Sequence, residues 1–366
     1  MITGYNNGEN PFIAAQRFID QNGLQQSYLQ EIADWIIQRT GQQTPTFDLS
    51  APRATTQPQP LVGQPTNTTA VNTNRLLPLR TMYFFSDVPS GLRSKLVSKL
   101  QDLNSTAPPT QALTSSEFEC VVSLAATLEN TSRYHASEIS TTEVAAALKM
   151  LNWSSNNLAI PFDLMRMIAS HPHGAEALAK HSSFKAILGR MASLLSDSSV
   201  PVTVSTVMLR FLVNCFRNGS LMKACLYNEE NVMVVSNIIE ASKALIASGN
   251  KNYRLSFGSL LANIAVTLGE LPSEKISSTT SDLYFRVMAT SRLLLQSDPI
   301  TDIVLICALT IGTLAFHAKQ RNILPELFSD VGVITSEFLQ VKGSWSTSSL
   351  AKEIEDSLTE MNSLLP

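Results

Sequence analysis

Apolar residues recur every three or four positions along most of this 366-residue chain, which is the spacing of amphipathic helices. No convincing alternation of apolar and polar residues marks a strand. From residue 78 onward the pattern predicts about a dozen helices, separated by short turns with Gly, Pro, Asn or Ser. We therefore expect an all-α fold. The predicted helices are residues 90–103, 115–129, 142–151, 161–169, 184–196, 201–217, 231–247, 253–269, 281–295, 300–318, 331–341 and 347–363.

Three of these segments are apolar on nearly every side: "TVMLRFLVNCF", "RLSFGSLLANIAV" and "DIVLICALTIGTL". A helix has this composition when neighbours cover it all round. The segments follow one another at roughly 45 to 50 residues, close to the ~40 to 47 residues of armadillo and HEAT repeats. We expect residues 77–366 to form an armadillo-like α-solenoid, with a large helical bundle as the alternative.

Two further helices are predicted before residue 42. The first begins after an N-cap at Asn10 and runs to Gln21, and the second ends at Thr40. Two short helices cannot bury their aromatic surface against each other, so a further partner is expected. The aromatic residues in question are Phe12, Phe18, Tyr28 and Trp35. Residues 42–76 are rich in Pro, Thr, Gln and Asn, which predicts a flexible, disordered linker.

Composition narrows the class of protein. With 44% hydrophobic and 16% charged residues the chain is expected to be globular, and a net charge of −3 argues against a nucleic-acid binder. Its four cysteines lie far apart in apolar runs and are expected to be buried free thiols. The apolar run 303–316 is too short for a membrane span and is expected to be a buried helix.

No catalytic motif is found, so the chain is expected not to be an enzyme and to need no cofactor. The best metal candidate is "HPHGAEALAKH", with His171, His173 and His181, but no cysteine or carboxylate completes a tetrahedral set. A surface loop is the favoured interpretation. Cys215 has the chemistry of a nucleophile, but its place among apolar residues favours core packing.

Two arginines stand within the apolar helices. Arg210 and Arg254 occupy positions where a buried guanidinium is costly without a partner. In a solenoid such a residue can face the concave groove and bind a carboxylate. An internal salt bridge, or a packed stem with a solvated head, explains the pattern equally well.

The opening stretch "GYNNGENPFIAAQRFIDQNGLQQSYLQEIADWIIQRTG" resembles the C-terminal end of the PFU domain of the phospholipase A2-activating protein (PLAA) family. From residue 77 the chain resembles the PUL domain of the same family, through "GLRSKLVSKLQDLNSTAP", "LRFLVNCF", "GNKNYRLSFGSLLANIAV" and "ALTIGTLA". The resemblance divides the chain into a PFU remnant (1–41), a linker (42–76) and a PUL domain (77–366).

In this family a WD40 propeller precedes PFU, PFU is an αβ domain that binds ubiquitin, and PUL is an armadillo-like domain. PUL binds the C-terminal tail of the AAA+ ATPase valosin-containing protein. The resemblance thus implies a non-catalytic adaptor in ubiquitin recycling and ubiquitin-dependent protein catabolism, in the cytoplasm and nucleus. Since the PFU strands are not represented here, the opening helices are expected to lack the sheet that they cover.

The resemblance also suggests site residues. Arg210 corresponds to the arginine of the family's "LR-x-x-x-NCF" helix and is expected to hold the ATPase tail, with Arg254, Lys251 and Lys319 nearby in the repeat pattern. Ubiquitin contacts are expected at the four aromatic residues named above. Two alternatives remain: a scaffold for another acidic peptide, and a phospholipase A2 activator, for which no basic amphipathic helix is found.

Overall fold

The computed structural model describes residues 15, 18, 28–40, 76–89, 91–134, 136–272, 275–297, 300–323, 327–340 and 342–364. The chain forms two compact units: residues 1–73 with 131–135, and residues 74–130 with 136–366. Most of the first predicted helix, with Phe12, lies outside the described residues. So does the predicted linker, apart from Leu76.

The first unit contains helix α2 (Leu29–Thr40). Ala33 and Ile36 of α2 are fully buried together with Ala15, and Ile32 packs against this small cluster. Tyr28 and Trp35 are 40% and 44% exposed. Helix α2 therefore contributes to a minor apolar core and leaves much of Tyr28 and Trp35 uncovered.

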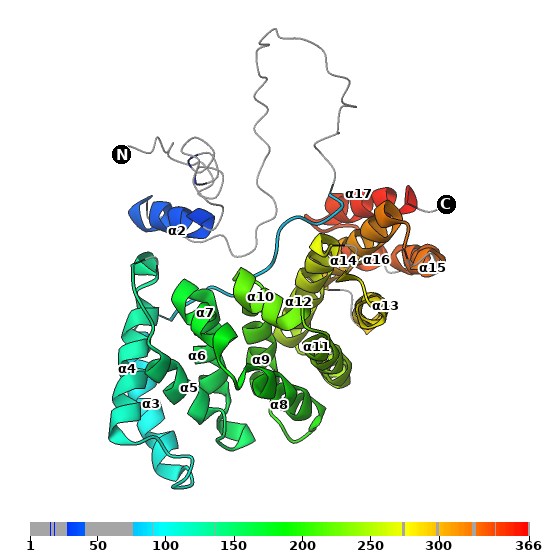
Figure 1. Ribbon diagram of the computed structural model, residues 1–366. Coiled ribbons are helices and arrows are strands. Elements are labelled where there is room, and N and C mark those ends of the chain that lie inside the picture. Colours follow the sequence, from blue (N-terminus) through cyan, green and yellow to red (C-terminus); the bar gives the residue numbers. More distant parts are fainter. Residues whose placement is uncertain are drawn as a thin grey trace. The chain divides into compact units, whose positions relative to one another are not determined.

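The second unit is helical along most of its described length, and its elements follow the chain in order through Figure 1. Helices α4 and α5 each begin with a capping box, in which a Ser or Thr side chain and a Glu side chain satisfy the free N–H groups of the first turn. The helices are α3 (Leu92–Thr106), α4 (Ser115–Glu129), α5 (Thr141–Met150), α6 (Ala159–Ser170), α7 (Pro172–Lys180), α8 (Phe184–Ser196), α9 (Val202–Cys215), α10 (Gly219–Leu226), α11 (Glu229–Ser242), α12 (Lys251–Glu270), α13 (Ser278–Ser297), α14 (Thr301–Arg321), α15 (Leu327–Gln340), α16 (Lys342–Trp345) and α17 (Ala351–Asn362).

These helices stack in rows. Helices α6, α9, α12, α14 and α17 lie side by side in one row, which we call the inner row. Helices α8, α11, α13 and α15 form a second row packed behind it, and the short helices α7 and α10 contact each other. This arrangement confirms the all-α solenoid (Figure 1).

The inner row explains the three strongly apolar segments in the sequence. Helix α12 is buried almost continuously from Tyr253 to Gly269, since α9 and α14 flank it and α13 packs against it. Helix α14 is long and apolar enough to cross a membrane, but α12, α13 and α17 pack around it and bury most of it. The expectation of a buried core helix at residues 303–316 is confirmed.

Helix α7 corrects one expectation. The segment "HPHGAEALAKH" forms a helix with Pro172 in its first turn, in place of the expected surface loop. His171 is fully buried and caps this helix, because its Nδ1 accepts a hydrogen bond from the N–H of Gly174 at 3.2 Å. Its Nε2 lies 2.9 Å from Ser137 Oγ.

Candidate functional site

An extended segment, residues 76–89, crosses the inner row before α3 begins, and we call it the strap. It first meets α17, then α14, α12, α9 and finally α6, so it runs opposite to the order of the helices (Figure 1). An extended chain offers unpaired backbone N–H and C=O groups, which must find partners where they are buried. The inner row supplies those partners.

Two asparagines bind the middle of the strap through its backbone. Asn263 Oδ1 accepts from the N–H of Tyr83 and its Nδ2 donates to the Tyr83 carbonyl, both at 2.8 Å. Asn214 makes the same pair of bonds with Phe85, both at 2.9 Å. Each side-chain amide thus replaces one rung of a β-ladder.

The ends of the strap are bound in the same way. Glu360 accepts from the N–H groups of Leu76 and Leu77 at 3.0 and 2.8 Å. Thr313 Oγ1 accepts from the N–H of Leu79 at 2.8 Å. At the other end the Arg166 guanidinium donates to the carbonyls of Phe85 and Asp87.

These partners occupy equivalent places in successive repeats. Five residues of the inner row, which we call the ladder residues, are separated by 47 to 50 positions, the length of one repeat: Arg166, Asn214, Asn263, Thr313 and Glu360. The sequence contains the signal, since Asn214, Asn263 and Thr313 are polar residues within the three segments that are apolar on nearly every side. It was not recognised because the strap has no periodic pattern to mark it as their partner.

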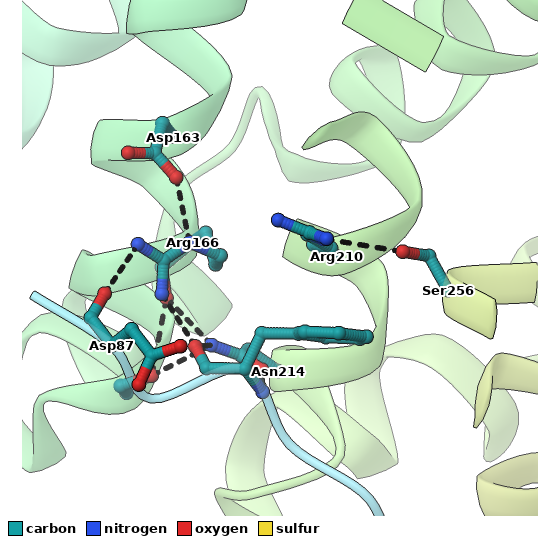
Figure 2. A network of polar contacts seen from close by, with 8 residues as sticks. Asp87, Asp163, Arg166, Arg210, Asn214 and Ser256 are labelled. Carbon is teal, nitrogen blue, oxygen red and sulfur yellow. Dashed lines mark hydrogen bonds and ion pairs between the residues drawn. The ribbon is translucent and has the colours of Figure 1, made fainter. Parts of the chain in front are cut away.

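Arg210 lies on α9 one turn before Asn214 (Figure 2). Its Nε donates to Ser256 Oγ of α12 at 3.2 Å, and its guanidinium lies 4.7 Å from the centre of the Phe85 ring. Ser256 itself donates to the Asn252 carbonyl, which fixes its hydroxyl as the acceptor. The Arg210 plane is therefore held in place, while neither of its Nη groups donates to any residue that the structure describes.

The surroundings of Arg210 favour an anionic ligand. Burial lowers the pKa of Arg210, and the nearby Arg166 guanidinium lowers it further, while Asp163 and Asp87 act in the opposite sense. Asp163 is already paired with Arg166 Nε at 2.7 Å. The Arg210 charge is thus partly desolvated and incompletely neutralised, so an added carboxylate is stabilised on its free Nη edge.

The other predicted basic residues differ. Arg254 is only 3% exposed and its Nε donates to the Ile246 carbonyl at 2.9 Å. It therefore supports its own repeat, which corrects the expectation that it faces a groove. Lys251 is exposed and lies 3.8 Å from Asp302. Lys319 Nζ donates to the Leu364 carbonyl at 2.7 Å near the end of the chain.

The remaining candidates offer little chemistry. Among the described residues no group of three or more His, Cys, Asp or Glu side chains is placed to hold a metal. His173 is exposed and His181 Nδ1 accepts from the N–H of Ser183. Cys215 is fully buried and burial raises the pKa of its thiol, which disfavours the nucleophilic thiolate. Of the expected ubiquitin contacts, Phe18 is half-buried.

Comparisons with known proteins identify two regions. The family model described as "PUL domain" matches residues 77–349, and the model described as "PFU (PLAA family ubiquitin binding)" matches residues 1–44. Phospholipase A-2-activating protein of Xenopus laevis is 20% identical over 308 residues, which are 72% of this chain and 36% of that protein. The chain thus spans little more than a third of that relative.

A solved structure agrees with the fold. A crystal structure of a PUL domain with a mutated PFU domain has a TM-score of 0.50 at 13% identity, covering 97% of this chain and 92% of that one. A PFU-PUL domain pair of Saccharomyces cerevisiae Doa1/Ufd3 has a TM-score of 0.49 at 13% identity, with the same coverage.

Proposed function

The chain belongs to the PUL-domain family of phospholipase A2-activating proteins, which are ubiquitin-pathway adaptors, and from this we propose that it is a non-catalytic adaptor for an AAA+ ATPase. Its inner row binds the C-terminal tail of an ATPase of the valosin-containing type. The PFU-like region links that ATPase to ubiquitin, in the cytoplasm and the nucleus.

The proposal rests on the geometry of the Arg210 guanidinium. A C-terminal tail ends in a carboxylate, and the two free Nη groups of Arg210 form a fork that matches two carboxylate oxygens. Ser256 and Phe85 hold the guanidinium, so little side-chain entropy is lost when the ligand binds. A hydrogen bond to a charged group contributes about 1.5 to 3 kcal/mol, or roughly a ten- to hundredfold change in Kd.

Fluorescence polarisation tests the proposal, with a labelled peptide of the ATPase C-terminal tail and the 366-residue chain. Arg210→Glu is expected to weaken binding by roughly a hundredfold, because it replaces attraction with repulsion. Arg210→Lys is expected to recover part of the affinity, since it keeps the charge without the fork. Lys352→Glu is the matched control, an equal charge reversal at an exposed position of α17.

Three outcomes separate the alternatives. Loss of binding in Arg210→Glu alone, with an unchanged thermal unfolding midpoint, supports the adaptor and its site. Equal binding by Arg210→Glu and the unaltered chain refutes the site. Equal binding of a scrambled tail peptide of the same composition identifies a scaffold for acidic peptides in general and refutes recognition of the ATPase tail.

The link to ubiquitin has its own test. Trp35 is exposed on α2 and is one of three tryptophans in the chain, so a protein that covers it changes its share of the fluorescence. Titration with ubiquitin is expected to shift the tryptophan emission of the unaltered chain but not that of Trp35→Ala, and Trp35→Ala is expected to weaken binding in calorimetry. Unchanged heats in the Trp35→Ala variant would remove this residue from the ubiquitin site.

A further inference from the structure

A hollow of about 390 Å³ lies between α3, α6 and α9, where Val207 is the lining residue of α9. This size falls within the range of ligand pockets. Its walls are mainly apolar side chains: Leu92, Leu96, Ile160, Leu164, Met167 and Val207. We call it the α3–α6–α9 pocket.

The rim of this pocket is basic. Lys95 and Lys99 line it from α3, both are exposed, and neither forms an ion pair with any residue that the structure describes. The carboxylate on the rim, Asp163, is paired with Arg166. An apolar floor with free cations around it is complementary to an apolar side chain flanked by carboxylates.

Arg210 connects the pocket to the proposed peptide site. Val207, which lines the pocket, precedes Arg210 by three positions on α9, and residues at this spacing are neighbours on one helix face. Neighbouring Cβ atoms on such a face are about 5 to 6 Å apart, and an extended peptide advances about 3.3 Å per residue. A peptide that places a carboxylate on Arg210 therefore has residues one to three positions away over the pocket.

We propose that the α3–α6–α9 pocket binds a large apolar side chain of the same acidic peptide whose carboxylate pairs with Arg210. This inference rests on the proposed function and adds to it a rule of recognition. The ligand carries a Leu-, Met- or Phe-sized residue about one to three positions from the carboxylate that Arg210 binds, with further acidic residues opposite Lys95 and Lys99.

The test fills the pocket. Ala159 lines it and is only half-buried, so Ala159→Trp places an indole in the space without disturbing the core. The matched control is Ala145→Trp, because exposed Ala145 lines a second hollow of about 370 Å³ between α5 and α8. Thermal unfolding midpoints establish that both variants fold.

Two labelled probes are used: the ATPase tail peptide and a synthetic Gly-Glu-Glu-Phe-Glu-Glu peptide, each with an analogue in which Ala replaces the large apolar residues. Ala159→Trp is expected to weaken both probes by roughly ten- to hundredfold, as for the loss of one buried apolar side chain, and Ala145→Trp is expected to change neither. The Ala analogues are expected to bind equally to Ala159→Trp and the unaltered chain. The change in the peptide and the change in the protein remove the same contact, so the second has no further effect.

The outcomes distinguish this inference from the proposed function. Unchanged tail binding in Ala159→Trp, together with weakened binding in Arg210→Glu, refutes the pocket and leaves the adaptor intact. Binding of the synthetic peptide alone, with loss in Ala159→Trp, supports the pocket and refutes the ATPase tail as its ligand. Equal loss in Ala159→Trp and Ala145→Trp refutes the pocket.

Discussion

Substitution of Asn263 by alanine tests whether the strap is held by the ladder residues. Asn263 is fully buried and makes two 2.8 Å hydrogen bonds to the backbone of Tyr83. Its Nδ2 also lies 3.4 Å from the Val213 carbonyl. Alanine removes all three bonds and leaves both backbone groups of Tyr83 without these partners.

The expected loss follows from these contacts. Each of the two short bonds contributes about 0.5 to 1.5 kcal/mol net, and a buried group left unpaired costs about 1 to 3 kcal/mol. The strap can detach and let water bind Tyr83, which limits the second cost. We therefore expect the free energy of unfolding to fall by about 2 to 3 kcal/mol. Asn263→Asp is expected to lose at least as much, because a carboxylate oxygen then faces the Tyr83 carbonyl.

Two measurements check this magnitude. Urea denaturation gives the change in unfolding free energy, and hydrogen exchange by mass spectrometry follows the Tyr83 amide. Asn156→Ala is the control, at an exposed position in the short helix η3 (Ser155–Asn157), and is expected to change the free energy by less than about 0.5 kcal/mol. Normal protection of the Tyr83 amide in Asn263→Ala would refute the argument that this side chain holds the strap.

Two further predictions concern buried positions. Burial lowers the pKa of His171 to about 4, so folding favours the neutral imidazole; stability is full above about pH 6.5 and falls by up to about 3 kcal/mol as the pH drops toward 4. His171→Asn keeps an N-cap acceptor and is expected to make the unfolding free energy less dependent on pH, as measured by denaturation at pH 7 and pH 5. The remaining dependence is due in part to His317, whose pKa is also lowered to about 4. An equally steep curve would contradict the assignment. Gly312→Ala places a Cβ 2.5 Å from Leu77 Cδ1 of the strap and is expected to cost about 1 to 3 kcal/mol despite the better helix propensity of alanine. Leu77→Ala in the same chain is expected to relieve the clash. If calorimetry shows that the two substitutions lower the unfolding free energy by strictly additive amounts, the clash is excluded.

Helix boundaries were predictable where local signals agree. Helices α4 and α8 have the predicted bounds, since apolar periodicity begins and ends sharply there, and α4 also has a capping box. Helix α7 was missed because its first turn, with Pro172, His173 and Gly174, contains few strong helix formers. A proline in the first turn was the available signal.

Arg210 and Arg254 show the limit of the same reasoning for the site. Both are cations within apolar helices, and the residue pattern supports a groove-facing position and an internal bond equally for each. The two arginines differ in their tertiary contacts. Arg254 lies in the first turn of α12, where its guanidinium reaches the carbonyl of Ile246. Arg210 instead donates to a serine hydroxyl and lies against the ring of Phe85, and Phe85 belongs to a segment without periodicity.

The chemistry of the ladder residues also determines what is left for a partner to recognise. Asn214 and Asn263 bind N–H and C=O groups that every residue except proline possesses, so these contacts place almost no demand on the identity of the strap's side chains. The strap thereby occupies the side-chain groups of the ladder residues that bind backbone. A second peptide must be selected by charge and side-chain shape instead, which gives this surface discrimination among ligands where a vacant backbone-binding face would accept any extended chain.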